Sequence, residues 1–130
     1  MDKYFMFILF STMCILTACV SVASTEENPL NYPDNETITV LFSDSSSLQD
    51  EHTYYDAYLA LQQHYDEEIP SIIIVDADDR DAIRFFEINQ FPTMLILTGK
   101  TEHVRLEGVL TEEAILAELL HFFLAKETNN

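Results

Sequence analysis

The sequence predicts one α/β domain with a mixed four-stranded sheet and helices on both faces. Two observations support this class. Short β-branched or apolar runs alternate with longer segments whose apolar residues recur at helical spacing. A helix separates the first two runs, whereas only a Gly-containing turn separates the last two. The order βαβα–ββα therefore predicts a parallel pair joined by a right-handed crossover, followed by an antiparallel hairpin.

The first half of the domain begins at residue 37. Thr37–Phe42 (TITVLF) is β-branched and apolar, as a buried strand is. Residues 47–68 carry apolar side chains at helical spacing, and Pro70 ends this helix. Ser71–Val75 (SIIIV) is apolar at successive positions, which is typical of a central strand covered on both faces.

The second half begins with a helix that Asp78 or Asp79 can cap and that runs to about Ile88. Two strands and a helix then complete the order: Pro92–Leu97 (PTMLIL), Glu102–Glu107 with the alternation of a half-exposed edge strand, and a final amphipathic helix from Thr111.

Four tyrosines distinguish the first of these helices. They are Tyr54, Tyr55, Tyr58 and Tyr65. We expect most of them to pack on the sheet with their hydroxyls reaching water. An exposed group of them would suit a protein or the sugar faces of a wall polymer.

The acidic composition restricts the partners. Six Lys and Arg stand against 23 Asp and Glu, so the formal net charge is −17. Nucleic-acid binding depends on Lys and Arg contacts with phosphate, and we therefore expect no nucleic-acid partner. The charge also favours solubility and basic partners.

The cysteines are confined to the N-terminal segment, at Cys14 and Cys19. A disulfide framework, a CxxC redox pair, a thiolate nucleophile and a Cys-based zinc site are therefore excluded from the domain. The four His lack zinc-binding spacing, and the acidic run Asp76–Asp81 lacks the Gly and spacing of a calcium loop. We expect neither a metal nor a cofactor.

The N-terminus has the pattern of a secretory signal, since Asp2 and Lys3 are followed by an uncharged, apolar run to Thr25. Leu16-Thr17-Ala18-Cys19 resembles the bacterial lipobox, which implies cleavage after residue 18 and lipidation of Cys19. Two alternatives remain open: cleavage after Ala23, which removes both cysteines, and an uncleaved membrane anchor.

Three parts follow from this pattern: a lipoprotein signal peptide at 1–18, an acidic tether at 19–36 and the domain at 37–127. The tether is small, polar and acidic and contains two Pro, which is typical of a flexible linker. Acyl chains on Cys19 would hold the protein at the cell membrane. We expect the domain to face the extracytoplasmic side.

The order and several motifs together resemble thioredoxin. A strand ends in VDAD, a short helix ends in FFEINQ, FPTMLIL follows, and the alternating strand leads to Gly108 and the last helix. Thioredoxins carry a proline before the third of these strands, usually followed by Thr, which corresponds here to Phe91-Pro92-Thr93. The resemblance covers residues 37–125 and implies a thioredoxin-like fold with a cis Phe91–Pro92 bond.

Two parts of the family's redox chemistry are missing. Aligned on ITVLF, the family's Cys-x-x-Cys falls on Ser47-Leu48-Gln49-Asp50, and its buried acid falls on Leu41. The hydroxyl of Ser47 has a far higher pKa than a thiol and cannot cycle between oxidised and reduced forms. The resemblance therefore implies a protein that is not an enzyme.

Ser47 and Asp50 have the spacing of a capping box with Asp in place of Glu. This predicts that the Ser47 hydroxyl accepts from a first-turn N–H, while the acids oppose the positive helix end. A polar recognition patch beside the Pro92 loop is the second interpretation.

In thioredoxins, the surface between the motif and the proline loop holds extended peptides, and binding there does not need the cysteines. The resemblance therefore implies that an envelope protein or extended peptide binds a candidate surface made of Ser47, Leu48, Gln49, Asp50, Phe91, Pro92 and Thr93. Two rival functions stay open. One is a wall- or peptidoglycan-associated structural lipoprotein, and the other is a thiol-redox accessory protein that uses a partner's cysteines.

Overall fold

The computed structural model describes residues 27–65 and 68–129. The predicted signal peptide, Cys19 and the first part of the predicted tether lie outside these ranges. The elements are β1 (Thr37–Ser43), α2 (Leu48–His64), β2 (Ile72–Asp76), α3 (Arg80–Phe85), β3 (Thr93–Thr98), β4 (Thr101–Glu107) and α4 (Glu112–Thr128). Every strand boundary lies within one residue of its predicted position, and the order of elements is confirmed.

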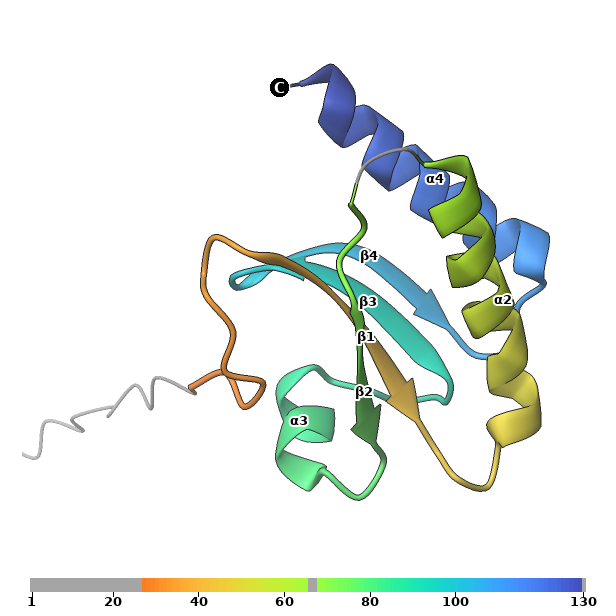
Figure 1. Ribbon diagram of the computed structural model, residues 1–130. Coiled ribbons are helices and arrows are strands. Elements are labelled where there is room, and N and C mark those ends of the chain that lie inside the picture. The colour runs from red at the N-terminus through yellow and green to blue at the C-terminus, as the bar shows by residue number, and fades with distance from the viewer. Residues whose placement is uncertain (1–26, 66–67, 130) are drawn as a thin grey trace, which may run out of the picture.

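The sheet has the order β2-β1-β3-β4 (Figure 1). β1 pairs with β2 in parallel, and with β3 in antiparallel orientation. β3 and β4 form the predicted hairpin. The predicted position of β2 in the centre of the sheet is wrong. Among the described strands, β2 pairs only with β1, so it is an edge strand.

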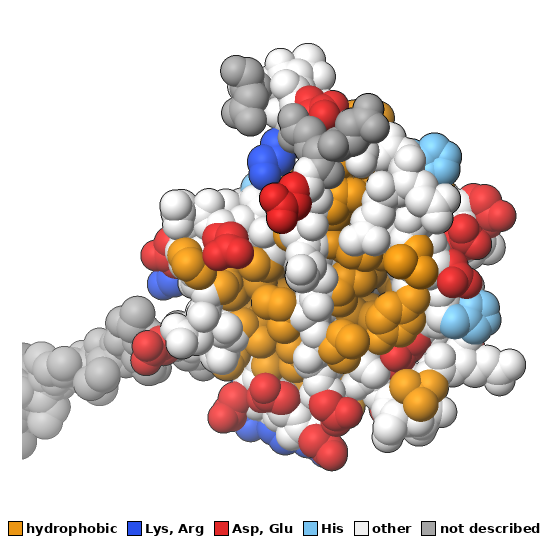
Figure 2. All heavy atoms as spheres, in the orientation of Figure 1, with side chains coloured by type: hydrophobic (Ala, Val, Ile, Leu, Met, Phe, Trp, Pro, Cys, Tyr) orange, Lys and Arg blue, Asp and Glu red, His pale blue; other side chains and the backbone are white. Residues whose placement is uncertain are grey.

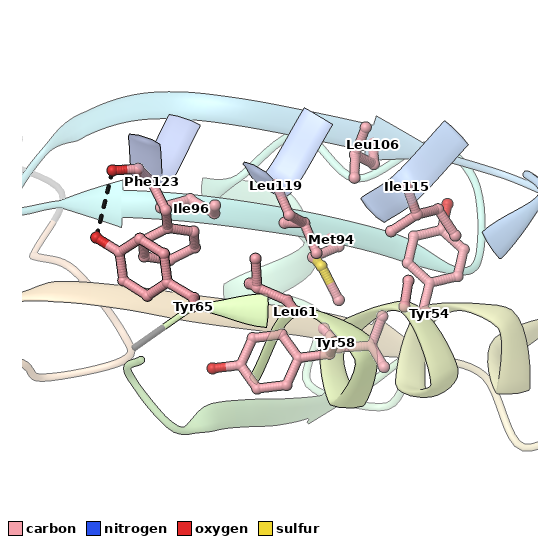
Figure 3. Packing of buried hydrophobic residues seen from close by; sticks show 12 residues of the cluster. Tyr54, Tyr58, Leu61, Tyr65, Met94, Ile96, Leu106, Ile115, Leu119 and Phe123 are labelled. Carbon is pink, nitrogen blue, oxygen red and sulfur yellow. Dashed lines mark hydrogen bonds between the residues drawn. The ribbon is translucent and has the colours of Figure 1, made fainter. Parts of the chain in front are cut away.

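Helices cover both faces, as predicted. α2 and α4 lie together on one face, and α3 lies on the other (Figure 1). Between α2, α4 and the sheet is the first cluster (Figure 3): Leu41, Tyr54, Ala57, Tyr58, Leu61, Tyr65, Met94, Ile96, Leu106, Ile115, Leu119 and Phe123. Beneath α3 is the second cluster: Ile38, Val40, Phe42, Val75, Ala82, Phe86, Ile88, Leu95 and Leu97. β1, β2 and β3 thus contribute alternate residues to the two faces, whereas β4 contributes to the first cluster alone.

α3 is shorter than predicted. Of the two predicted caps, Asp78 and Asp79, it is Asp79 that caps the helix, because its side chain accepts from the Ala82 N–H at 3.1 Å. The helix stops at Phe85 because Glu87 has a φ of 52°, which an α-helix cannot contain. The Ile88 N–H then bonds back to the Ile83 carbonyl at 2.9 Å, as in a Schellman motif.

Two tyrosine hydroxyls, one in α2 and one just after it, do not reach water as predicted. Tyr54, Tyr58 and Tyr65 pack on the sheet as expected, but Tyr54 donates to the Gly108 carbonyl at 2.7 Å and Tyr65 to the Phe123 carbonyl at 3.3 Å (Figure 3). The expectation that such hydroxyls reach water is therefore wrong for these two, because a backbone carbonyl lies within reach inside the core.

The described part of the predicted tether lies against the fold. Leu30 and Tyr32 pack on the second cluster, and the Tyr32 hydroxyl donates to the Gly99 carbonyl. Gly99 has a φ of 56°, and a Cβ there would lie 2.5 Å from the Asp34 carbonyl oxygen. The turn between β3 and β4 therefore needs glycine to make room for this segment.

Candidate docking surface at the end of β1

The loop after β1 is closed by its own polar groups. The Asp44 carboxylate accepts from the Ser46 N–H at 2.9 Å and from the Ser46 hydroxyl at 2.8 Å. These two hydrogen bonds lower the pKa of Asp44. The Ser47 N–H bonds to the Asp44 carbonyl at 2.8 Å, and α2 begins at the next residue.

The predicted capping box is wrong. Ser47 is the N-cap residue, but its side chain accepts no hydrogen bond from the first turn. Its hydroxyl instead donates to the Asp44 carbonyl at 3.2 Å. Ser47 has φ −123° and ψ 24°, whereas an N-cap side chain reaches the first turn from β-region angles.

Glu51, and not Ser47 or Asp50, supplies the side-chain acceptor that ties this loop to α2. Its carboxylate accepts from the Ser43 hydroxyl at 2.8 Å and from the Asp44 N–H at 3.1 Å, and the residue is only 1% exposed. The other carboxylate oxygen has no partner among the described residues. One sequence signal could have identified Glu51: it lies three residues before Tyr54 and seven before Tyr58, in phase with the buried side of α2.

The proline loop lies at the same end of the sheet. The Phe91–Pro92 bond is cis, as the thioredoxin resemblance implies. Thr93 is opposite Phe42 in the β1–β3 register, so Pro92 lies at the level where β1 ends. The Thr93 hydroxyl donates to the Gln90 carbonyl at 2.8 Å, which closes the loop on itself.

Two hydrogen bonds at Gly108 connect the proline loop to α2. The Gly108 N–H donates to the Pro92 carbonyl at 2.8 Å, and the Gly108 carbonyl accepts from the Tyr54 hydroxyl at 2.7 Å. Asp50 lies one turn before Tyr54 on the same side of α2. The two predicted halves of the candidate surface therefore lie at one end of the domain.

Exposure separates the seven predicted residues into two roles. Pro92 and Thr93 are buried, so they shape the loop and do not offer side chains to a partner. Leu48 is 61% exposed and Gln49 is exposed. Ser47, Asp50 and Phe91 are partly exposed. Val109, which is 70% exposed and follows Gly108, extends this surface and was not predicted. In the sequence, only the neighbouring Gly108 could have indicated that Val109 belongs to this surface.

The surface offers apolar contacts and carboxylates. Leu48 and Val109 are exposed apolar side chains, and Asp44 and Asp50 add negative charge. Within residues 27–65 and 68–129, no group of three His, Asp or Glu side chains is arranged to hold a metal ion. The helices in these ranges are also too short or too polar to cross a bilayer.

We expect alkaline pH to weaken the link between α2 and Gly108. Burial, with a smaller contribution from Glu107, raises the pKa of Tyr54 from 10.0 to about 12. The folded state then keeps a proton that the unfolded state releases above pH 10. The contribution of Tyr54 to the free energy of unfolding is fully present below pH 10. It falls by at most about 1.4 kcal/mol per pH unit toward pH 12.

Tyr54→Phe tests this expectation by urea unfolding at several pH values. The variant should lose about 1 kcal/mol near neutral pH, because the Gly108 carbonyl loses its donor. It should also show a shallower decline above pH 10 than the wild type. Burial raises the pKa of Tyr32, Tyr55 and Tyr58 in both proteins, so part of the decline remains. Equal slopes would contradict a buried, proton-holding Tyr54.

The chain is similar to a bacterial lipoprotein in sequence and to thioredoxins in backbone structure. No family model matches the chain. A Pal-related lipoprotein of Bacillus subtilis (strain 168) is 27% identical over 124 residues, which cover 91% of this chain and 96% of that protein.

Solved structures with a similar backbone include thioredoxins. Thioredoxin-2, a component of the malaria parasite protein secretion machinery, has a TM-score of 0.52 and 23% identity, over 70% of this chain and 86% of that one. The germline-specific thioredoxin Deadhead of Drosophila melanogaster has a TM-score of 0.53 and 11% identity, over 68% and 82%. The fold of this chain is therefore thioredoxin-like.

Proposed function

We propose that this protein is a bacterial lipoprotein, anchored at the extracytoplasmic side of the cell membrane, whose thioredoxin-like domain binds extended protein segments without thiol chemistry. The anchor is supported by Leu16-Thr17-Ala18-Cys19 and by similarity to a lipoprotein over 91% of the chain. The absence of cysteine after residue 19 supports binding without a dithiol.

The observation that carries the binding proposal is the pair of hydrogen bonds at Gly108. They hold the Pro92 loop against α2, so that Leu48 and Val109 are presented at the same end of the sheet as the cis peptide. A loop held by these hydrogen bonds, with exposed apolar side chains at the same end of the sheet, suits an extended segment, because little ordering is left to be done when the partner binds.

The charge of the surface indicates the preferred segment. Asp44 and Asp50 are close to Leu48 in the sequence, in the loop and the first turn of α2, and a basic residue within the bound segment would complement them. Since these carboxylates are at least partly solvent-exposed, we expect them to affect the rate and salt dependence of association more than the final affinity.

Site-specific photo-crosslinking in intact cells tests this proposal. A crosslinker at Gln49 should capture an envelope protein, and Leu48→Asp, Asp50→Ala or Phe91→Ala should each reduce that capture severalfold. Leu124→Asp is the matched control, because Leu124 is an exposed leucine (49%) on α4. Its capture should equal that of the wild type.

Unchanged capture in all three surface variants would place the binding site elsewhere. Co-sedimentation with purified wall material that is equally unaffected by these variants would favour the rival function, a wall-associated structural lipoprotein.

A further inference from the structure

The outer edge of β2 is apolar and without a partner strand. Within residues 27–65 and 68–129, β2 pairs with β1 on one side and with no strand on the other. Edge strands are normally protected from pairing by charge, proline or a bulge. β4, the opposite edge, follows this rule with Glu102, His103 and Arg105. The four residues Ile72–Val75 of β2 carry no such protection.

Apolar side chains flank this edge on both faces of the sheet. Ile72 packs on the first cluster and Ile73 on the second, so the strand has one isoleucine on each face. Ile74 is 57% exposed, and Leu59 on α2 is 55% exposed. Figure 2 shows the hydrophobic side chains gathered on both sides of the β2 backbone. A strand added here would meet apolar surface above and below its own backbone.

The acidic side chains around β2 favour a partner with positive charge. Between residues 68 and 83 the chain has Arg80 as its only base, against five acids: Glu68, Asp76, Asp78, Asp79 and Asp81. These acids flank the strand at both ends, and the described ones next to it, Glu68 and Asp76, are exposed. A second copy of the chain would bring the same acids opposite each other, which opposes self-association.

We propose that the free edge of β2 is a second docking site, at which a partner protein adds a strand whose apolar residues are flanked by lysine or arginine. The main-chain hydrogen bonds supply the pairing, and apolar side chains at successive positions of the added strand cover the exposed parts of Ile72, Ile73 and Ile74. The flanking bases face the acids at the two ends of β2.

The test uses a strand-forming peptide with the sequence KKIVIVIKK and the full chain held on phosphatidylcholine vesicles. The peptide should slow amide hydrogen exchange within Ile72–Asp76 at least tenfold, and its binding should weaken as salt is raised. A peptide with glutamate in place of every lysine should bind at least tenfold more weakly. N-methylation of alternate amides on the pairing side should abolish binding.

Protein variants locate the site. Ile74→Lys, at a side chain that is already exposed, should reduce the peptide's protection of the β2 amides at least tenfold, whereas Leu124→Lys and the docking-surface variant Leu48→Asp should leave that protection unchanged. Equal binding of the glutamate peptide, or protection confined to other strands, would overturn the proposal. Slow exchange, without peptide, of the β2 amides that face away from β1 would overturn it too. The edge would then be occupied by the N-terminal segment or, if exchange depends on concentration, by a second copy.

Discussion

Leu41→Asp should leave most of the protein unfolded at neutral pH and room temperature. Leu41 is fully buried in the first cluster, opposite Met94 in the β1–β3 register. The substitution removes a packed side chain and buries a carboxyl group whose nearest neighbours are apolar. Together these cost about 5 kcal/mol or more, comparable to the whole stability of a small domain.

The pH dependence of this variant separates its two costs. A buried, unpaired carboxyl has a raised pKa, so the folded variant binds a proton that the unfolded chain releases. The variant should therefore be more stable at acidic than at alkaline pH, which circular dichroism during urea unfolding would show. Leu41→Ala, the control, should lose about 2–5 kcal/mol with no added pH dependence.

A Leu41→Asp variant as stable as the wild type would contradict this reasoning. It would mean that the position still accommodates the acid that thioredoxins carry there.

Glu51→Ala should lower the free energy of unfolding by about 3 kcal/mol. The Ser43 hydroxyl and the Asp44 N–H both donate to the Glu51 carboxylate, and removal of the acceptor leaves both donors unpaired at the start of the loop. Faster amide exchange in residues 43–47 should accompany the loss, because this carboxylate ties the loop to α2.

Glu51→Gln is the matched control. It keeps the oxygen that accepts both hydrogen bonds and removes the buried charge, so its stability should stay within about 1 kcal/mol of the wild type. If Glu51→Ala is as stable as Glu51→Gln, the carboxylate does not hold the loop, and the docking surface depends on other contacts.

The fold was predictable because local patterns determine most of it. Four short apolar runs, the helical spacing between them and the Gly99 turn give element types and boundaries without reference to distant residues. The position of Phe91-Pro92-Thr93 before β3 likewise predicted the proline loop and its cis peptide bond. The place of β2 was harder, because a continuous apolar run has the same appearance in a covered central strand and in an uncovered edge.

The details of the candidate surface depend on contacts between residues far apart in the chain. Tyr54 bonds to Gly108, 54 residues away, and spacing along a helix does not reveal that partner. Ser47 and Asp50 matched a capping pattern, yet the loop backbone turned the Ser47 hydroxyl toward Asp44 and gave Glu51 the acceptor role. Local sequence predicts that α2 begins here, but the loop conformation decides which side chain stabilises the start.

Insulin reduction by the full chain, with a dithiol reductant and a thioredoxin standard, tests most directly whether this fold works here by binding without thiol chemistry. We expect the mature wild-type protein to give no turnover above buffer, since residues 20–130 contain no thiol, the proposed cleavage removes Cys14 and the proposed lipidation consumes the thiol of Cys19. Ser47→Cys combined with Asp50→Cys, which restores the dithiol at the start of α2, should gain measurable turnover. Turnover by the wild-type protein would contradict the proposal and favour a thiol-redox accessory role.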